Sequence, residues 1–275
     1  MLLAERSVAP YRFRHGNGVL LVSMPHAGTF VPHSVGRDFN DIAALRPDTD
    51  WHMPRLYDFV RELDASVIVA NCSRYVIDVN RPPGGENLYP GRDTPLLCPV
   101  DTFDCQPLYR DGGGPSREQV ERRVEAIWKP YHRRLASELE RIRAAHGIAV
   151  LWEAHSIVSR APRLFDGRLP DFNLGTVDDA SCDPELSRAL IAGLQRHAGH
   201  TAVLNGRFKG GYITRRFGRP SEGVHAVQLE MAQCLYMEEK APYPYREDLA
   251  EQVRPILREQ LEMAKSWAEG RRESP

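Results

Sequence analysis

The chain has 275 residues, of which 42% are hydrophobic, so it is long enough to bury the core of one large α/β domain. Its 36 basic residues nearly balance 37 acidic ones, and a formal net charge of -1 gives no general attraction to nucleic acid or to an anionic membrane. No apolar run approaches the roughly 20 residues of a membrane span, and the N-terminus lacks the apolar segment of a signal peptide.

The first third of the chain predicts a strand, a helix and two further strands. Residues 20–24 (LLVSM) form a short apolar run that ends at a Pro-His-Ala-Gly turn. Residues 51–63 (WHMPRLYDFVREL) then predict a helix, because apolar residues recur at helical spacing from Leu56 to Leu63, and Asp50 lies at its N-terminus. Residues 66–70 (SVIVA) and 75–79 (YVIDV) each predict a buried strand.

Strands alternate with helices along the rest of the chain. Residues 82–115 are rich in Pro and Gly and predict a long irregular segment, a kind that is often functional. A helix is expected from about Ser116 to Ala145, with a kink at Pro130. The later elements are strands at 148–152, 201–204 and 224–231, helices at 184–197 and 249–267, and loops at 158–183 and 205–223.

Continuous apolar strands between amphipathic helices indicate the fold class. Such strands are typical of a mixed, mainly parallel sheet that helices cover on both faces. No linker-like stretch or internal repeat divides the chain, so we expect a single α/β domain over residues 1–275.

Polar side chains lie at or near the ends of three predicted strands. His26 follows the first strand, His155 follows residues 148–152, and Glu230 lies within the last strand. Ligands of open α/β sheets bind beyond the carboxyl ends of strands, so these side chains are expected to converge, with Asp50 as a fourth. Spacing alone leaves other roles open: no HExxH pattern is present, either histidine could be structural, and Asp50 could cap a helix.

Two imidazoles and a carboxylate, from His26, Asp50 and His155, would suit a hydrolytic zinc site with one position open for water. The metal would polarise a scissile carbonyl and lower the pKa of water towards about 7. Glu230 stands in an apolar strand, where a carboxylate is costly to bury without a partner or a function. We therefore expect it to act as the general base.

Arginines indicate an anionic substrate. Asn80 and Arg81 follow the predicted strand 75–79, and a guanidinium can bind a carboxylate through two hydrogen bonds while Asn adds a donor. Arg74, Arg215 and Arg216 are further cationic candidates, the last two in a Gly-rich loop that could close over a substrate. A surface ion pair is the alternative role for Arg81. A dicarboxylate needs two cationic anchors, and the chain offers them.

Seven blocks, in order over nearly the whole chain, resemble the N-formylglutamate amidohydrolase family. They are SMPHAGTFVP (23–32), DTDWHMPRLYDF (48–59), SRYVIDVNRPP (73–83), LWEAHSI (151–157), FNLGT (172–176), NGRFKGGYITRRFG (205–218) and HAVQLEMAQCLYM (225–237). The resemblance implies a fold and site layout related to zinc carboxypeptidases and aspartoacylases. It also implies metal-dependent hydrolysis of N-formyl-L-glutamate to formate and L-glutamate, a step of histidine degradation.

The same resemblance implies roles for individual residues. It implies His26, Asp50 and His155 as metal ligands, Glu230 as base and the Asn80-Arg81 pair as carboxylate clamp. In zinc carboxypeptidases and aspartoacylases the acidic ligand lies a few residues after the first histidine, whereas no acidic residue follows His26 closely here. Asp50 is preferred because it opens the predicted helix; the alternatives are Asp38, Asp48, His52 and Glu153.

Two other functions stay open. The substrate could be another N-acyl or N-formimino amino acid, or the chain could be a non-catalytic module that binds a metal or a carboxylate. A serine or cysteine hydrolase is disfavoured because the sequence has no GxSxG elbow and no cysteine beside a plausible base. The five cysteines are scattered without a CxxC pair, which favours a reducing cytoplasm as the compartment.

Overall fold

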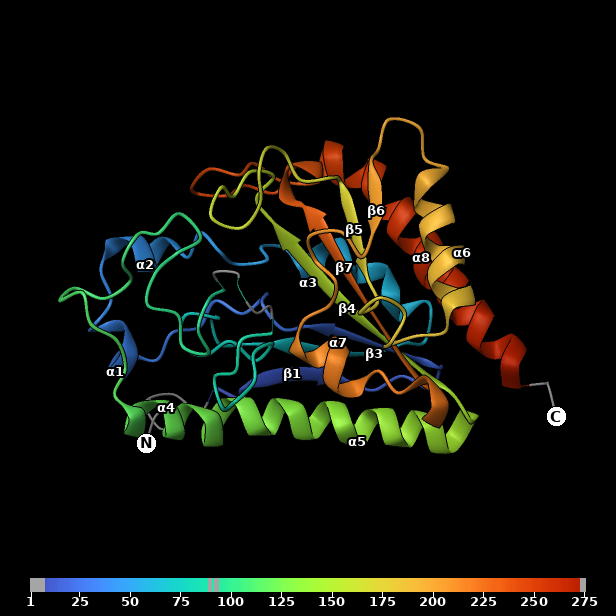
Figure 1. Ribbon diagram of the computed structural model, residues 1–275, viewed down its shortest axis with the longest axis horizontal. Coiled ribbons are helices and arrows are strands. Elements are labelled where there is room, and N and C mark those ends of the chain that lie inside the picture. The colour runs from blue at the N-terminus through green and yellow to red at the C-terminus, as the bar shows by residue number, and fades with distance from the viewer. Residues whose placement is uncertain (1–7, 89–90, 92–93, 273–275) are drawn as a thin grey trace.

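The computed structural model describes residues 8–88, 91 and 94–272. Its centre is one seven-stranded sheet with the order β1-β3-β2-β4-β7-β5-β6, and helices cover both faces (Figure 1). The strands are β1 (Tyr11–Arg14), β2 (Leu20–Met24), β3 (Ser66–Ala70), β4 (Ala149–Ile157), β5 (Phe172–Gly175), β6 (Ala202–Leu204) and β7 (Val224–Ala232). The α-helices are α1 (His33–Gly36), α2 (Asp41–Leu45), α3 (Met53–Leu56), α4 (Arg117–Arg123), α5 (Lys129–His146), α6 (Pro184–Gln195), α7 (Tyr212–Phe217) and α8 (Glu247–Arg272).

The middle of the sheet is parallel. Strands β3, β2, β4 and β7 run in one direction as neighbours, while β1 pairs antiparallel with β3 and β5 antiparallel with β7. The predicted fold class, an α/β fold with a mixed and mainly parallel sheet, is therefore confirmed. Because the four central strands share a direction, their carboxyl ends meet at one edge of the sheet, where ligand sites usually form.

Side chains of β4 alternate between two hydrophobic cores. Val150 and Trp152 face the core that α6 and α8 cover, and Leu151 faces the core that α5 and α7 cover. Every residue of β4 is buried, as expected for a central strand with helices on both sides. The two-residue alternation also fixes which polar residues of this strand share a face.

The predicted helix of residues 116–145 is interrupted once. Ser116 caps α4 through a capping box with Gln119, and a π-helical turn, η2 (Val124–Trp128), connects α4 to α5. Pro130 lies in the first turn of α5, directly after the π turn, and cannot donate a hydrogen bond to that preceding turn. The expected irregularity therefore takes the form of a π turn just before the proline, and α4 and α5 lie end to end along the sheet (Figure 1).

Two predicted elements were wrong. Residues 75–79 form a buried turn in place of a strand, because side chains compete for the backbone: Ser73 Oγ accepts from Tyr75 N, and Asp78 Oδ1 accepts from Asn80 N. The predicted helix over 51–63 is only α3 followed by a 3₁₀ turn, η1 (Asp58–Arg61). Conversely, β5 and α7 lie in stretches that had been predicted as loops.

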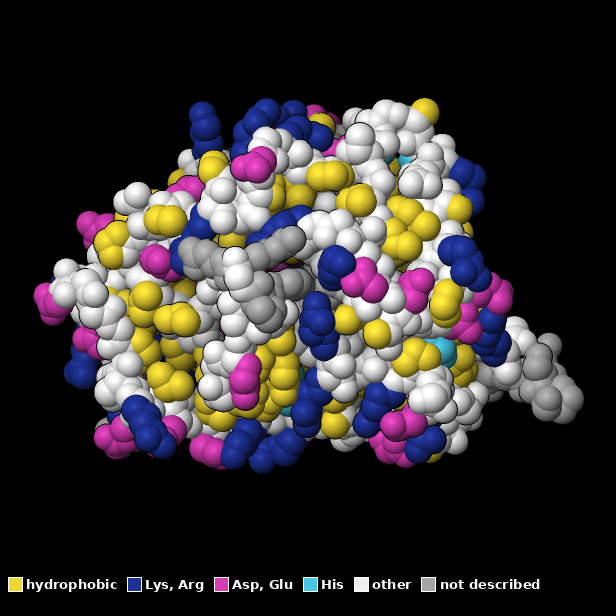
Figure 2. Space-filling view, viewed as in Figure 1, with side chains coloured by type: hydrophobic (Ala, Val, Ile, Leu, Met, Phe, Trp, Pro, Cys, Tyr) yellow, Lys and Arg dark blue, Asp and Glu magenta, His cyan; other side chains and the backbone are white. Residues whose placement is uncertain are grey.

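Acidic and basic side chains are interspersed on the face drawn in Figure 2, in keeping with the near-neutral composition. Along α4 and α5 several form pairs one helical turn apart, such as Arg117 with Glu121 and Arg122 with Glu118. Among the residues described, no helix combines the length and apolar character that crossing a membrane requires. All five cysteines are free thiols.

Shortening Leu151 should destabilise the fold, because it is fully buried at the centre of the sheet. Leu151→Ala is expected to lower the free energy of unfolding by about 2–5 kcal/mol, measured by urea denaturation. Leu96 is 57% exposed, so Leu96→Ala is the control and should change the free energy by no more than about 0.5 kcal/mol. Equal effects of the two substitutions would contradict this assignment of the core.

Candidate metal and catalytic site

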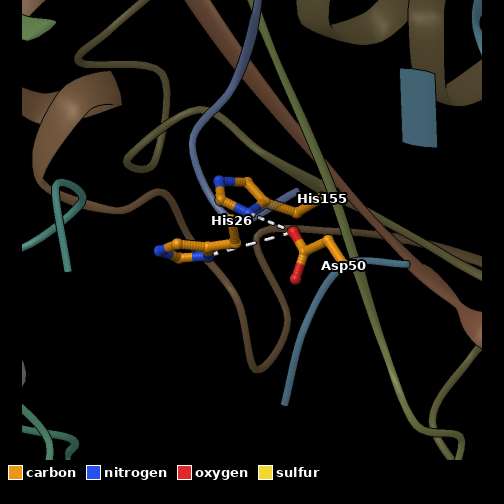
Figure 3. A group of neighbouring side chains, drawn as sticks. All are labelled: His26, Asp50 and His155. Carbon is orange, nitrogen blue, oxygen red and sulfur yellow. Dashed lines mark hydrogen bonds and ion pairs between the residues drawn. The ribbon is translucent and has the colours of Figure 1, made fainter. Parts of the chain in front are cut away.

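Three side chains from distant parts of the chain meet at the carboxyl edge of the sheet. His26 lies just beyond β2, Asp50 lies before α3, and His155 lies near the end of β4. One ligand atom of each lies within 4.8 Å of the others, and all three residues are buried. Asp50 Oδ2 is 3.0 Å from His155 Nδ1 and 3.9 Å from His26 Nδ1, so the carboxylate points between the two imidazoles (Figure 3). This donor set suits zinc or a similar divalent ion.

Asp50 reaches the first histidine through the backbone. Its N–H donates to the carbonyl of His26 at 3.1 Å, which brings together two segments that the sequence separates. The other acidic candidates lie elsewhere: Asp48 Oδ2 accepts the N–H of Phe103, and Asp38 forms a half-exposed pair with a neighbouring arginine. His52 faces the carbonyl of residue 243 and takes no part in this group.

A fully buried carboxylate stands behind each histidine. His26 Nε2 lies 2.6 Å from Asp78 Oδ1, and His155 Nε2 lies 3.2 Å from Glu153 Oε1. When Nε2 donates to the carboxylate, Nδ1 keeps its lone pair and turns it towards Asp50, as a metal ligand requires. Arg74 Nη1 lies 3.3 Å from His26 Nδ1, which agrees with an unprotonated nitrogen there. Burial alone would raise the pKa of Asp78, but His26 and Arg74 hold it well below its usual range.

The site concentrates negative charge in a buried place. Burial would lower the pKa of His155, but its hydrogen bonds with Asp50 and Glu153 outweigh burial and raise it well above its usual range. A proton on His155 and a divalent cation are therefore alternative ways to balance the same carboxylates. The residues present thus fit a bound metal ion by geometry, by tautomer and by charge.

Glu230 stands beside this group. It pairs with His155 in the register of β4 and β7, so both side chains project from the same face of the sheet. Burial raises the pKa of Glu230 to about 8, and the carboxylates of Asp50 and Glu153 add to the effect. A carboxyl group that exchanges its proton near neutral pH is suited to general acid–base chemistry.

A cavity of about 70 Å³ opens beside these residues, and cations line its wall. Arg74, Arg81 and Arg207 contribute to the lining, together with Phe103 and Phe208. A larger cavity of about 500 Å³ lies by α1 and α2, but it lacks the buried titratable cluster. Chemistry therefore places the site at the smaller cavity, since size alone does not identify a catalytic centre.

Asn80, Arg215 and Arg216, the remaining residues predicted to bind substrate, differ in how they lie relative to the cavity. Asn80 is buried and lines the cavity: its Oδ1 accepts the N–H of Ile213, and its Nδ2 lies 3.1 Å from His155 Nε2. Arg215 donates to the carbonyl of Gly210, and Arg216 is exposed over an aromatic ring of α7. Neither Arg215 nor Arg216 is among the residues that line the cavity.

Three residues of the site were not predicted from the sequence: Asp78, Arg207 and Gln228. Arg207 belongs to the same Gly-rich block as Arg215, and no periodicity distinguishes the arginine that faces the cavity. Asp78 was hidden inside a predicted strand. Gln228 could have been found, because polar residues alternate in V-Q-L-E as they do in W-E-A-H and so share one face of the sheet with Glu230.

The fold and this site together define an α/β protein with a buried His-Asp-His group beside a carboxylate, as in metal-dependent hydrolases. Residues 18–237 match the model of the N-formylglutamate amidohydrolase family. The chain is 52% identical over 259 residues to the N-formylglutamate deformylase of Pseudomonas aeruginosa, covering 94% of this chain and 97% of that one. It is 50% identical over 255 residues to the N-formylglutamate deformylase of Pseudomonas putida, covering 93% and 95%.

A solved structure with the same fold supports membership of this family. The crystal structure of an N-formylglutamate amidohydrolase from Ralstonia eutropha JMP134 superposes with a TM-score of 0.78 at 26% identity, over 94% of this chain and 100% of that one. A protein from Agrobacterium tumefaciens shares the fold with a TM-score of 0.73 at 20% identity, over 97% and 99%. The chain therefore belongs to the N-formylglutamate amidohydrolase family.

Zinc binding should depend on the grouped side chains. The wild-type chain is expected to bind one zinc ion per molecule, and His155→Ala to weaken binding at least about a hundredfold, because one of three ligands is lost. Competition with a chromophoric chelator measures the affinity. His52→Ala, a control outside the group, should bind zinc as the wild type does; equal affinity of the His155 variant would contradict the assignment of ligands.

Proposed function

We propose that this chain hydrolyses N-formyl-L-glutamate to formate and L-glutamate, with zinc held by His26, Asp50 and His155. The observation that carries the proposal is the buried His-Asp-His group beside Glu230. Relatives named N-formylglutamate deformylase, about half identical over nearly the full length, support the substrate. A non-catalytic binding module would have no use for a buried carboxylate of raised pKa next to the metal ligands.

The metal ion, when bound, supplies Lewis-acid polarisation of the formyl carbonyl and acidifies the attacking water. Glu230 does the proton transfer. Its carboxylate accepts a proton from the water as the water attacks, and later gives that proton to the amine nitrogen of the departing glutamate. Since the pKa of Glu230 lies near 8 and a nearby cation would lower it, the carboxylate can be charged at neutral pH and still return a proton.

Arg74 is suited to the charge that develops on the formyl oxygen. It is buried, and Asp78 fixes one end of its guanidinium at 2.8 Å, while its other end points at the nitrogen of His26 that faces Asp50. Phe103 covers the guanidinium, with the ring centroid 4.9 Å from the guanidinium carbon. A cation held in advance, away from water, stabilises an oxyanion more strongly than a mobile one does.

Arg81 and Arg207 are suited to the two carboxylates of the substrate, because both line the cavity. Arg81 is braced by the carbonyls of Asn80 and Pro95, which its N–H groups contact at 3.0 and 3.1 Å. Asn80 also lines the cavity, but its Oδ1 already accepts the N–H of Ile213, so we assign the charged contact with the substrate carboxylate to Arg81. Arg207 takes the second role, which the sequence had suggested for Arg215 or Arg216.

Glu230→Gln should separate catalysis from metal binding. The amide keeps the shape of the side chain but cannot accept the proton, so kcat for formate release is expected to fall by about 10²–10⁴-fold. Bound zinc, measured in the same samples, should stay at the wild-type level. Glu238→Gln, an exposed control, should leave kcat unchanged; a zinc-loaded Glu230→Gln enzyme with near-normal turnover would overturn the role of the base.

The side-chain carboxylate should be recognised through charge. N-formyl-L-glutamine has the same shape as N-formyl-L-glutamate without that charge, so the ratio of their kcat/KM values isolates this contact. Arg207→Ala is expected to reduce the preference for the glutamate compound by about tenfold or more, since a hydrogen bond to a charged group contributes about 1.5–3 kcal/mol. Arg216→Ala is the matched control. An unchanged ratio in the Arg207 variant would place the second carboxylate elsewhere.

A panel of N-acyl and N-formimino amino acids decides between this reaction and its main alternative. Activity on other N-acyl or N-formimino amino acids that exceeded activity on N-formyl-L-glutamate would replace the substrate and leave the chemistry intact. Loss of all formate release on addition of a chelator, with recovery on adding zinc, is the expected result for a metal enzyme.

A further inference from the structure

Helix α7 is attached to the polar face of the central strands by three hydrogen bonds. The hydroxyl of Thr214 donates to Glu153 Oε2 at 2.5 Å. The N–H of Ile213 donates to Asn80 Oδ1 at 2.9 Å, and the N–H of Gly211 donates to Gln228 Oε1 at 2.7 Å. All these bonds are buried, so each contributes to fixing where the segment that carries α7 lies.

One of these bonds leads to the carboxylate that holds His155, and a second leads to a side chain that packs against His155. Glu153 offers one carboxylate oxygen to Thr214 and places the other 3.2 Å from His155 Nε2. Asn80 accepts the N–H of Ile213 with its oxygen, and its Nδ2 lies 3.1 Å from the same nitrogen of His155; when that nitrogen donates to Glu153, this second approach is a packing contact only. Glu153 and Thr214 are both fully buried, so water cannot replace either partner. The orientation of the His155 ring thus depends on groups that α7 holds in place.

The same segment also forms part of the substrate cavity. Arg207, Phe208 and Gly211 line it, all within a few residues of Thr214. Gly211 allows the close approach: a Cβ there would lie 2.4 Å from Asn80 Nδ2, closer than any side chain tolerates. Gly210 has a φ of 124°, which favours glycine, so the chain can turn sharply into α7. One stretch therefore contacts both the substrate space and the support of the metal ligand.

We propose that Thr214 is a positioning residue that couples segment 205–217 to the metal centre through Glu153 and His155. The hydroxyl fixes the rotation of the Glu153 carboxylate, and the carboxylate fixes the tautomer and the ring plane of His155. Without the hydroxyl, a wholly buried carboxylate oxygen loses a partner that no water can replace. This inference rests on the metal site of the proposed function and adds a residue outside the first layer of ligands.

Coupling of this kind acts in both directions. If the docked segment favours metal binding, metal binding must favour the docked segment by the same free energy. The amide protons of Gly211 and Ile213 report docking, because both donate to side chains of the site. Adding zinc to the wild-type chain should slow their hydrogen exchange, whereas amides of α6, which packs on the opposite face, should exchange at the same rate with and without zinc.

Thr214→Val tests the proposal, because valine has nearly the same shape without the hydroxyl. We expect its zinc dissociation constant to rise about tenfold, and Thr214→Ser to recover most of the affinity because it retains the hydroxyl. Ser66→Ala is the matched control: Ser66 is also fully buried and donates to a buried carboxylate, Glu138, at 2.5 Å, but it lies away from the metal ligands. This control should bind zinc as the wild type does.

The outcomes distinguish a failure of the proposed function from a failure of the role of Thr214. A wild-type chain that binds no zinc overturns the proposed function and this inference with it. A wild-type chain that binds zinc, with Thr214→Val equal to it in affinity, overturns the inference alone. Were the valine variant to fold poorly, the wild-type exchange rates would still decide: unchanged exchange at Gly211 and Ile213 on adding zinc contradicts the coupling.

Discussion

The structure depends on one electrostatic constraint, the gathering of carboxylates in a place that water hardly reaches. Four of them lie within one neighbourhood at the carboxyl edge of the sheet: Asp50, Asp78, Glu153 and Glu230. Burying even one ionised group without a partner costs several kcal/mol, and Arg74 is a single guanidinium. The raised pKa values of His155 and Glu230 are the two responses available to the protein itself, since each takes up a proton. A divalent cation answers the same need more fully and leaves Glu230 free to act on a substrate.

The fold supplies this cluster by simple means. Parallel strands bring β2, β4 and β7 to one edge, and alternation along β4 and β7 sets Glu153, His155, Gln228 and Glu230 on a single face. The loop after β3 adds Arg74 and Asp78, and one backbone hydrogen bond adds Asp50. The apolar residues between these polar positions face the opposite core, where α6 and α8 cover them. Stability and chemistry thus divide along alternate residues of the same strands.

The sequence was sufficient to predict the central strands, because their apolar residues follow a regular pattern. Long apolar runs identified the central strands, and the position of His26, His155 and Glu230 at their ends was enough to expect convergence, which the 4.8 Å grouping of the first two with Asp50 agrees with. Periodicity failed where side chains override it. YVIDV has the composition of a strand, yet Ser73 and Asp78 capture the backbone and form a turn. Loop geometry could not be predicted from periodicity either: Arg207 lines the cavity and Arg216 does not, although both lie in the same Gly-rich block.

Asn80 and Arg81 are adjacent in the sequence but have different surroundings in the structure. An Asn beside an Arg is chemically able to bind a carboxylate, and the sequence offers no reason to separate the two residues. The Asn80 amide, however, already accepts the N–H of Ile213 and lies against His155, although both Asn80 and Arg81 line the cavity. Adjacent residues in a turn point in different directions, so a motif of two polar residues can serve two layers of one site. In the proposed site Asn80 lies against His155 while Arg81 binds the substrate, and α7 contacts Asn80 through Ile213. The segment of α7 thus lines the cavity and holds Glu153, which in turn contacts His155, so a shift of this segment would act on the cavity and on the metal ligand together.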